Sequence, residues 1–187
     1  DDSYPESGAV TAGVGYMETH PHCGVAGFRV YNLRLETEET AIFSPGPERM
    51  FIGCGAMLRT EVLSAIGGFD SHLFLYEHEI EFSMRVWDSG SEVHYVPHVR
   101  IYHRAAVKNR GLSRGKDCRR VFYTARNIPY VMLLHFSLRA VAFRVLRIIS
   151  GRLIGAIISG CGLRTGLGLL QGLLLGLRMR NGHTVCD

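Results

Sequence analysis

The sequence predicts an α/β fold followed by a basic helical region, and two observations lead to this prediction. In residues 1–103, short segments rich in β-branched and aromatic residues alternate with segments of helical periodicity, which is typical of α/β proteins. The charge also changes sign along the chain. Residues 1–103 carry six Lys and Arg against fifteen Asp and Glu, whereas residues 104–187 carry fifteen against two. We therefore expect an acidic domain and a basic one with different partners.

The chain begins with a turn and continues with a helix, a strand and a loop. Apolar residues at helical spacing predict a short helix over residues 9–20, and the β-branched and aromatic residues within 24–33 predict a strand. Residues 36–48 are acidic and contain a Pro-Gly-Pro sequence, which predicts a mobile loop.

The middle of the acidic part predicts a buried strand followed by two helices. Residues 50–59 are apolar with two glycines, which is typical of a strand that another group approaches closely. Thr60 can N-cap a short helix. This helix is predicted to end at Gly67, because glycine readily adopts the positive φ of a C-cap. A second helix is predicted over residues 76–89, where the apolar residues share one face and Gly90 follows.

Two short strands, 92–96 and 100–103, are then predicted on either side of Pro97. They lead into a basic loop over residues 104–120, which contains two glycines.

From residue 121 onward the pattern is apolar and helical, with arginines at intervals. Its longest uncharged run, residues 165–177, is shorter than the ~20 residues that span a bilayer. We therefore expect helices that lie in the membrane interface, with arginines at headgroup level. Gly168, Gly172 and Gly176 form a small-residue stripe that would let another helix come close. The alternative is a soluble helical hairpin packed on the domain.

Five scattered cysteines without a C-x-x-C pair favour reduced thiols in a cytosolic compartment. The first residues do not resemble a secretory leader. A chain that opens on two aspartates and a turn is expected to begin inside a fold.

Candidate chemistry gathers at the start of the helix over 76–89. Glu77, His78, Glu79 and Glu81 lie within five residues, more than placement of acids at a helix N-terminus requires. His103 ends the last predicted strand. Imidazole and carboxylate oxygen together suit Mn²⁺ or Mg²⁺, so His103 is a candidate metal ligand. Asp1 and Asp2 would supply further oxygen ligands.

Several short motifs follow one another in order: Asp1-Asp2-Ser3-Tyr4-Pro5, Gly53-Cys54-Gly55 with Arg59, Gly67-Gly68-Phe69-Asp70, Phe74-Leu75-Tyr76-Glu77-His78-Glu79-Ile80-Glu81-Phe82 with Arg85, Val96-Pro97, and Tyr102-His103. From Asp1 to about Asn127 the chain resembles the C-terminal two-thirds of a family-2 glycosyltransferase. It is similar to the bacterial branch that adds sugars such as rhamnose or galactofuranose to cell-envelope polymers.

The resemblance implies a GT-A fold, the Rossmann-like α/β fold of nucleotide-diphospho-sugar transferases, truncated at its N-terminus and followed by amphipathic C-terminal helices. Residues 1–120 would form the metal- and acceptor-binding half of the catalytic domain. Residues 121–187 would form a basic amphipathic membrane-associating region. Because the family's nucleotide-binding half is missing, we expect this chain to be inactive alone.

The resemblance also implies roles for single residues. Asp2, Asp1 and His103 would hold Mn²⁺ or Mg²⁺ at the donor pyrophosphate. The family usually shows Glu-Asp where this chain has His78-Glu79, so a glutamate replaces the expected catalytic base. Glu79 is our choice for that base.

Two acids remain alternatives to Glu79 as the base, namely Glu77 and Glu81. Gly53 and Gly55 would let the backbone approach sugar or acceptor, with tight strand packing as the alternative. Asp70 would bind acceptor hydroxyls or cap a helix, and His78 is also placed on the acceptor side.

The implied enzyme is an inverting, metal-dependent hexosyltransferase. It would move a sugar from a nucleotide-diphosphate donor to a cell-envelope glycan or a lipid-linked acceptor, as a peripheral protein on the cytoplasmic face of the membrane. The C-terminal helices could support oligomers. The alternative is a non-catalytic membrane-associated binding module. Nucleic acid is not an expected partner, because the arginines of the tail are interleaved with Leu, Ile and Gly.

Overall fold

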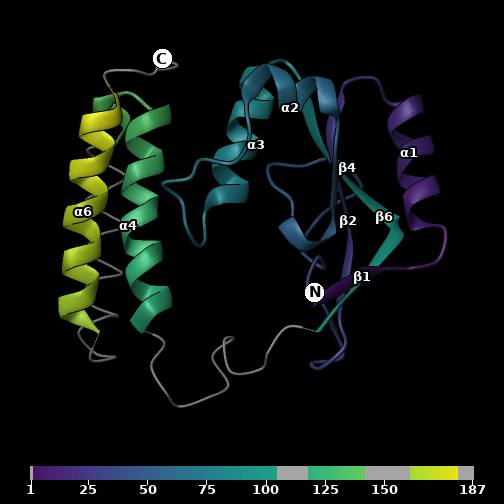
Figure 1. Cartoon of the computed structure of the whole chain (residues 1–187), viewed down its shortest axis with the longest axis horizontal. Coiled ribbons are helices and arrows are strands. Elements are labelled where there is room, and N and C mark those ends of the chain that lie inside the picture. The colour runs from purple at the N-terminus through teal and green to yellow at the C-terminus, as the bar shows by residue number, and fades with distance from the viewer. Residues whose placement is uncertain (1, 105–117, 142–160, 181–187) are drawn as a thin grey trace. The chain divides into compact units, whose positions relative to one another are not determined.

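The chain divides into two compact units in a computed structural model that describes residues 2–104, 118–141 and 161–180 (Figure 1). The first unit comprises Asp1–Ser71 and His78–Leu112, and the second comprises His72–Glu77 and Ser113–Asp187. The short segment His72–Glu77 therefore belongs with the C-terminal helices.

The first unit contains one mixed six-stranded sheet. Its strands are β1 (Ser3–Pro5), β2 (Cys23–Asn32), β3 (Thr37–Glu38), β4 (Gly46–Pro47), β5 (Ala56–Leu58) and β6 (Glu92–His103). The two long strands, β2 and β6, run parallel at the centre. β1 and β4 pair antiparallel with β6, and β3 and β5 pair antiparallel with β2.

Helices cover both faces of this sheet, because inward-facing residues of the strands alternate between two apolar cores. On one face, α1 (Ala9–Thr19) packs Met17 against Phe28 and other residues of the sheet. On the other face, α2 (Thr60–Ile66) and α3 (His78–Asp88) cover a core that contains Phe82 and Val86 (Figure 1). This arrangement confirms the predicted α/β class.

The helix over residues 9–20 and the strand over 24–33 are confirmed within one residue at each end. The buried strand predicted over 50–59 is wrong for most of its length. Residues Gly53–Gly55 form a 3₁₀ turn, η1, and only Ala56–Leu58 pair with β2. The two glycines favour this turn over an extended strand.

Pro97 does not divide two strands, as predicted, but lies inside the continuous strand β6. The pairing of β2 with β6 shifts register at this point, from Phe28 opposite Val96 to Arg29 opposite Arg100. Proline cannot donate to the ladder, and this irregularity accommodates it.

Helix α3 begins two residues later than predicted because of the backbone before it. Tyr76 and Glu77 have φ of 66° and 65°, in the left-handed region that an α-helix cannot include. The buried side chain of Asn127 donates to the carbonyls of Leu75 and Tyr76, at 2.7 and 2.9 Å. Asn127 lies on the helix Cys118–His135, so its side chain fixes the left-handed backbone of residues 76–77 against that helix.

The second unit contains two helices that lie side by side, α4 (Cys118–His135) and α6 (Gly162–Arg180) (Figure 1). The predicted glycine stripe is the surface of α6 that meets α4. Gly168 faces Phe122, Gly172 faces Arg126, and Gly176 faces Tyr130 and Leu133. Since these contacts advance in the same direction along both helices, α4 and α6 run parallel to each other.

The contact at Gly172 gives a stability prediction with a matched control. A Cβ at this position would clash with the backbone carbonyl of Arg126. Backbone cannot rotate away as a side chain can, so Gly172→Ala should destabilise the second unit by about 1–3 kcal/mol. On the same helix a Cβ at Gly166 meets nothing within 4 Å. Gly166→Ala should therefore stabilise the helix by up to about 1 kcal/mol. Urea unfolding followed by circular dichroism checks both signs, and equal effects of the two substitutions would contradict the close packing.

The expectation of five reduced thiols is wrong for one pair of cysteines. Cys118 and Cys161 form a disulfide with a sequence separation of 43 residues. Cys23 and Cys54 are not joined in a disulfide, and burial raises the pKa of the Cys23 thiol to about 11. The bond differs from the reduced state that the cysteine spacing predicted for all five thiols. Spacing missed it because the two residues are neither close in sequence nor part of a pattern.

None of the helices within residues 2–104, 118–141 and 161–180 is long and apolar enough to cross a membrane. Of the basic loop predicted over 104–120, residues 105–117 lie outside the described residues, and residues 118–120 belong to α4 instead. The helical pattern over 142–160 also lies outside the described residues.

Candidate functional site

The carboxyl ends of the two parallel strands meet at one edge of the sheet. Asn32 ends β2 and His103 ends β6, and the two residues are register partners. β1 pairs with the other side of β6, with Ser3 opposite His103. Ligands of open α/β sheets bind outside the carboxyl ends of parallel strands. The residues at this edge are therefore candidates for a ligand-binding site.

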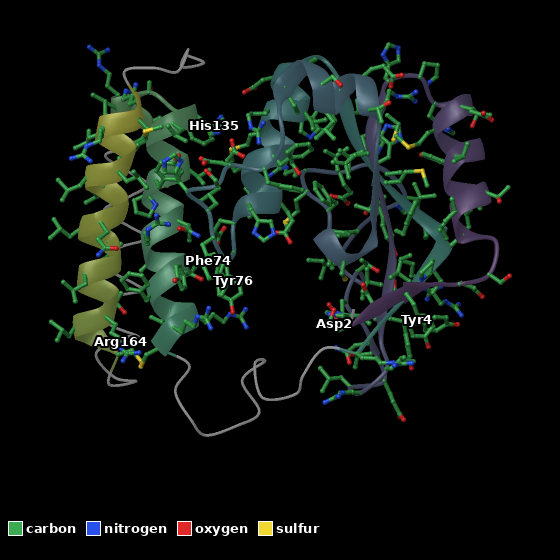
Figure 2. The ribbon with its side chains drawn as sticks, viewed as in Figure 1. Asp2, Tyr4, Phe74, Tyr76, His135 and Arg164 are labelled. Carbon is green, nitrogen blue, oxygen red and sulfur yellow. A yellow bond between two sulfur atoms is a disulfide. The ribbon has the colours of Figure 1, made fainter. Side chains whose placement is uncertain are left out.

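His103 lies between two carboxylates at this edge. Its Nδ1 is 2.9 Å from Oε1 of Glu39, and its Nε2 is 3.4 Å from Oδ2 of Asp2. The side chains of His103 and Glu39 are 11 and 6 % exposed, whereas that of Asp2 is 64 % exposed. Figure 2 shows Asp2 beside the start of β1, near the N-terminus that is labelled in Figure 1. The predicted pair of Asp2 and His103 is thus brought together, while Asp1 lies outside the described residues.

Glu39 is a residue of this site that the sequence interpretation missed. Its Oε1 also accepts a hydrogen bond of 2.7 Å from Nδ2 of Asn32, which is fully buried. The Oδ1 of Asn32 in turn accepts from the backbone N–H groups of Arg34 and Leu35. The acidic run that follows the strand was a signal, but the neighbouring Pro-Gly-Pro made the whole segment look like a mobile loop.

Glu39 determines which nitrogen of His103 carries a proton. An ionised carboxylate can only accept, so Nδ1 of His103 donates to Glu39. In the neutral imidazole the lone pair is then on Nε2, which faces Asp2. Two acceptors that face each other at 3.4 Å favour a cation between them, or a proton on Nε2. Carboxylates that orient histidine ligands through the other ring nitrogen are common around metal ions.

The residues present fit a divalent metal as a pair of ligands. Nε2 of His103 and the carboxylate of Asp2 converge, and imidazole with carboxylate oxygen suits Mn²⁺ or Mg²⁺. Glu39 contacts the opposite ring nitrogen, so it supports His103 without sharing its ligand position. Among the described residues no group of three His, Cys, Asp or Glu side chains could hold a metal ion. The described chain therefore offers two ligands at this edge.

Glu79, the predicted base, lies in the first turn of α3 with its side chain 23 % exposed. Burial raises the pKa of its carboxyl. A hydrogen bond and the charge of His78, together with the backbone N–H groups of Glu79 and Gly53, outweigh burial and leave the pKa below its ordinary value. Nε2 of His78 is 3.3 Å from Oε1 of Glu79. Glu79 is therefore an ionised, partly accessible carboxylate at neutral pH.

The two alternative acids differ from Glu79. Glu81 is 2 % exposed and accepts two hydrogen bonds from Arg85, at 2.7 and 2.8 Å. Arg85 also donates to the carbonyls of Ile66 and Gly68 after α2. Glu81 therefore anchors the loop between α2 and α3. Glu77 has left-handed backbone and belongs to the other unit. Glu79 is the acid best placed to meet a substrate.

The candidate acceptor-side residues differ in what they contact. A Cβ at Gly53 would lie 3.0 Å from Oε1 of Glu79, so glycine lets the backbone reach the carboxylate. Gly55 instead packs against Val30 and Ile101, where a Cβ would meet their side chains at 2.8 and 3.1 Å. His78 meets the ring of Phe69 edge-on at 5.7 Å. Asp70 is half-buried in the segment between α2 and α3.

The turn η1 connects the two groups of candidate residues. Its first residue, Gly53, meets Glu79, and its last residue, Gly55, packs on Ile101. Ile101 is two residues before His103 on β6. The base candidate and the metal-ligand candidates are thus built on one continuous framework in the first unit.

No protein-family model matches the chain, and no curated protein matches it significantly.

Proposed function

We propose that this chain is the metal- and acceptor-binding part of an inverting, metal-dependent glycosyltransferase of family 2, with the GT-A fold. The observation that carries the proposal is the array of Asn32, Glu39, His103 and Asp2 at the carboxyl ends of the parallel strands. It supports a divalent cation facing solvent at the position where α/β enzymes bind their ligands. A base candidate on the same framework supports group transfer over simple binding.

The donor in this proposal is a nucleotide-diphosphate sugar. Asp2 and His103 would hold Mn²⁺ or Mg²⁺, and such an ion stabilises negative charge that grows on a leaving pyrophosphate. Glu39 would hold the ring of His103 through Nδ1, so that Nε2 faces Asp2.

The acceptor hydroxyl is activated by Glu79 in this proposal. The hydroxyl oxygen forms a bond to the anomeric carbon as the bond from that carbon to the diphosphate oxygen breaks. The hydroxyl proton passes to the Glu79 carboxylate, and the nucleoside diphosphate leaves with the bonding electron pair. One displacement inverts the anomeric centre. A carboxylate ionised at neutral pH can accept this proton without first losing one.

The residues around Glu79 would shape the acceptor side. Gly53 leaves room beside the carboxylate and donates its N–H to it, while His78 fixes the carboxylate's orientation. Asp70, in the segment before α3, would accept hydrogen bonds from acceptor hydroxyls. The acceptor is a glycan or a lipid-linked sugar of the cell envelope.

Protein expressed from the complete reading frame that contains these residues tests the proposal. It should transfer sugar from a panel of nucleotide-diphosphate sugars with Mn²⁺ or Mg²⁺, and lose this activity in a chelator. Transfer that is unaffected by the chelator, or the absence of transfer from every donor while the protein still binds envelope glycans, would favour a binding module over the enzyme.

The metal pair can be tested on the 187-residue chain itself by Mn²⁺ titration with calorimetry or electron paramagnetic resonance. His103→Gln should abolish the site, and Glu39→Gln should weaken Mn²⁺ binding about 10- to 100-fold because it removes the carboxylate that orients His103. The matched controls are His98→Gln, an exposed histidine on the same strand, and Glu36→Gln, an exposed acid in the same segment. Both controls should bind Mn²⁺ as the wild type does. Unchanged binding in His103→Gln would contradict the metal site.

A further inference from the structure

Helix α6 carries an exposed stripe of five leucines. They are between 48 and 82 % exposed and recur at alternating intervals of four and three residues: Leu163, Leu167, Leu170, Leu174 and Leu177. This spacing places all five on one face of a helix. We call this face the leucine stripe. Apolar surface of this extent on a helix marks an interaction site more often than chance exposure.

The leucine stripe lies on the face of α6 opposite to α4. The opposite face is the glycine stripe, where Gly168, Gly172 and Gly176 are buried against α4. Neighbouring leucines of the stripe are only three or four residues apart, so the apolar face extends along most of α6. The packing partner of α6 within the described chain therefore leaves the leucines exposed.

A polar line runs beside the leucine stripe and carries only positive charge. Arg164, Gln171 and Arg178 are exposed and seven residues apart, so they share one flank of the helix. Figure 2 shows Arg164 at the N-terminal end of α6. The helix contains no acidic residue. A cation in the first turn opposes the helix dipole, so Arg164 does not serve the stability of α6.

We propose that the leucine stripe of α6 binds the surface of an anionic membrane, with the helix lying in the plane of the interface. Leucines would enter the boundary of headgroups and acyl chains, and Arg164 and Arg178 would contact the anionic headgroups beside them. The charge of residues 104–187, fifteen basic against two acidic residues, is complementary to such a surface. This inference does not depend on the proposed transferase activity.

A second copy of the chain fits the leucine stripe less well. The leucine spacing also matches the a and d positions of a coiled coil, but Arg164 and Arg178 would then flank the seam. Coiled-coil partners supply acids opposite such arginines, and α6 has none. The charges therefore favour lipid as the occupant.

Vesicle sedimentation with the full chain tests the proposal. The wild type should bind vesicles of equal parts phosphatidylcholine and phosphatidylglycerol, and bind pure phosphatidylcholine weakly. Leu170→Gln with Leu174→Gln should weaken binding at least about tenfold, because the substitutions replace two exposed apolar side chains that would contact the lipid. The matched control replaces two exposed leucines outside the stripe, Leu63→Gln with Leu138→Gln, and should bind as the wild type does.

A charge variant separates the electrostatic part of the interaction. Arg164→Gln with Arg178→Gln should weaken binding to the anionic vesicles about fivefold per arginine, and leave binding to phosphatidylcholine unchanged. Wild-type binding by the leucine variant would overturn the proposal. So would a leucine variant that changes the chain from dimer to monomer without changing its vesicle binding, because a second copy would then be the occupant.

A fluorescent variant keeps the proposal testable if the leucine variant fails to fold. Trp87 is the chain's one tryptophan, so Trp87→Phe with Leu174→Trp places a single reporter in the stripe. Its emission should shift to shorter wavelength with anionic vesicles and be quenched by brominated acyl chains. Emission that does not respond to vesicles would overturn the proposal.

Discussion

Glu79→Gln is expected to lower sugar transfer by about 10²–10⁴-fold, the range that a positioned general base contributes. Glutamine keeps the size of the side chain and can still accept the N–H of Gly53, but it cannot take the proton of the acceptor hydroxyl. The fold should be retained, because the Glu79 side chain is partly exposed and α3 packs through Phe82 and Val86. The measurement is turnover under saturating donor and acceptor, with thermal unfolding as the check on folding.

Two other glutamates serve as controls for this substitution. Glu61→Gln removes an exposed carboxylate from the first turn of α2, so it should leave turnover unchanged and lower stability by at most about 1 kcal/mol. Glu81→Gln breaks the buried pair with Arg85 and should lower the unfolding temperature, since such pairs cost about 3–5 kcal/mol when one partner is lost. Full activity in Glu79→Gln would exclude it as the base.

The pH dependence follows from the direction of the Glu79 shift. Burial raises the pKa of this carboxyl, but His78 and the two backbone N–H groups together lower it by more than burial raises it. The net pKa therefore lies below the ordinary value. A base works in its ionised form, so activity is present above this pKa and is lost as the pH falls through it. The acid limb of the pH–rate profile should therefore lie below the ordinary range of a glutamic acid. In His78→Gln the limb should move toward higher pH.

Removing the disulfide is expected to have a large effect on the stability of the second unit. Cys118→Ser with Cys161→Ser should lower the free energy of unfolding of the second unit by about 2–4 kcal/mol, because the open chain of the unfolded state gains entropy. Urea unfolding followed at the helical band should show the shift. Wild-type protein in a strong reductant should unfold at the same urea concentration as the double variant.

Thiol counting and a third cysteine complete this experiment. In non-reduced, denatured protein three of the five cysteines should react with a thiol reagent, since two are joined. Cys54→Ser, at a half-buried cysteine outside the disulfide, should leave the unfolding midpoint of the second unit unchanged. Five reactive thiols would contradict the bond.

The sequence predicted those parts of the fold that depend on local pattern. Periodicity placed α1 and β2 correctly, and the left-handed freedom of Gly67 marked the end of α2, where φ is 79°. The spacing of the glycines on α6 predicted a close helix neighbour, and α4 is that neighbour. These features follow from a few consecutive residues, and each is decided by backbone conformation or by one helix face.

The features that pattern missed depend on residues far apart in the chain. Glu39 reaches His103 across 64 residues, so no local signal distinguishes it from the other acids of its segment. The backbone of Tyr76 and Glu77 is held by the side chain of Asn127, 51 residues from Tyr76. Tertiary contacts overrode the helical propensity that had placed the start of α3 at Tyr76.

The parallel arrangement of α4 and α6 places like poles of the two helices next to each other. Both N-termini lie at the end that Cys118 and Cys161 join, and the aligned peptide dipoles give both the same partial positive charge. Arg119, Arg120 and Arg164 add full charges of the same sign there. Repulsion should therefore loosen the pair first at this end, and more strongly in dilute salt than at high ionic strength. The disulfide therefore joins α4 and α6 covalently at the end where electrostatic repulsion would otherwise begin to separate the two helices.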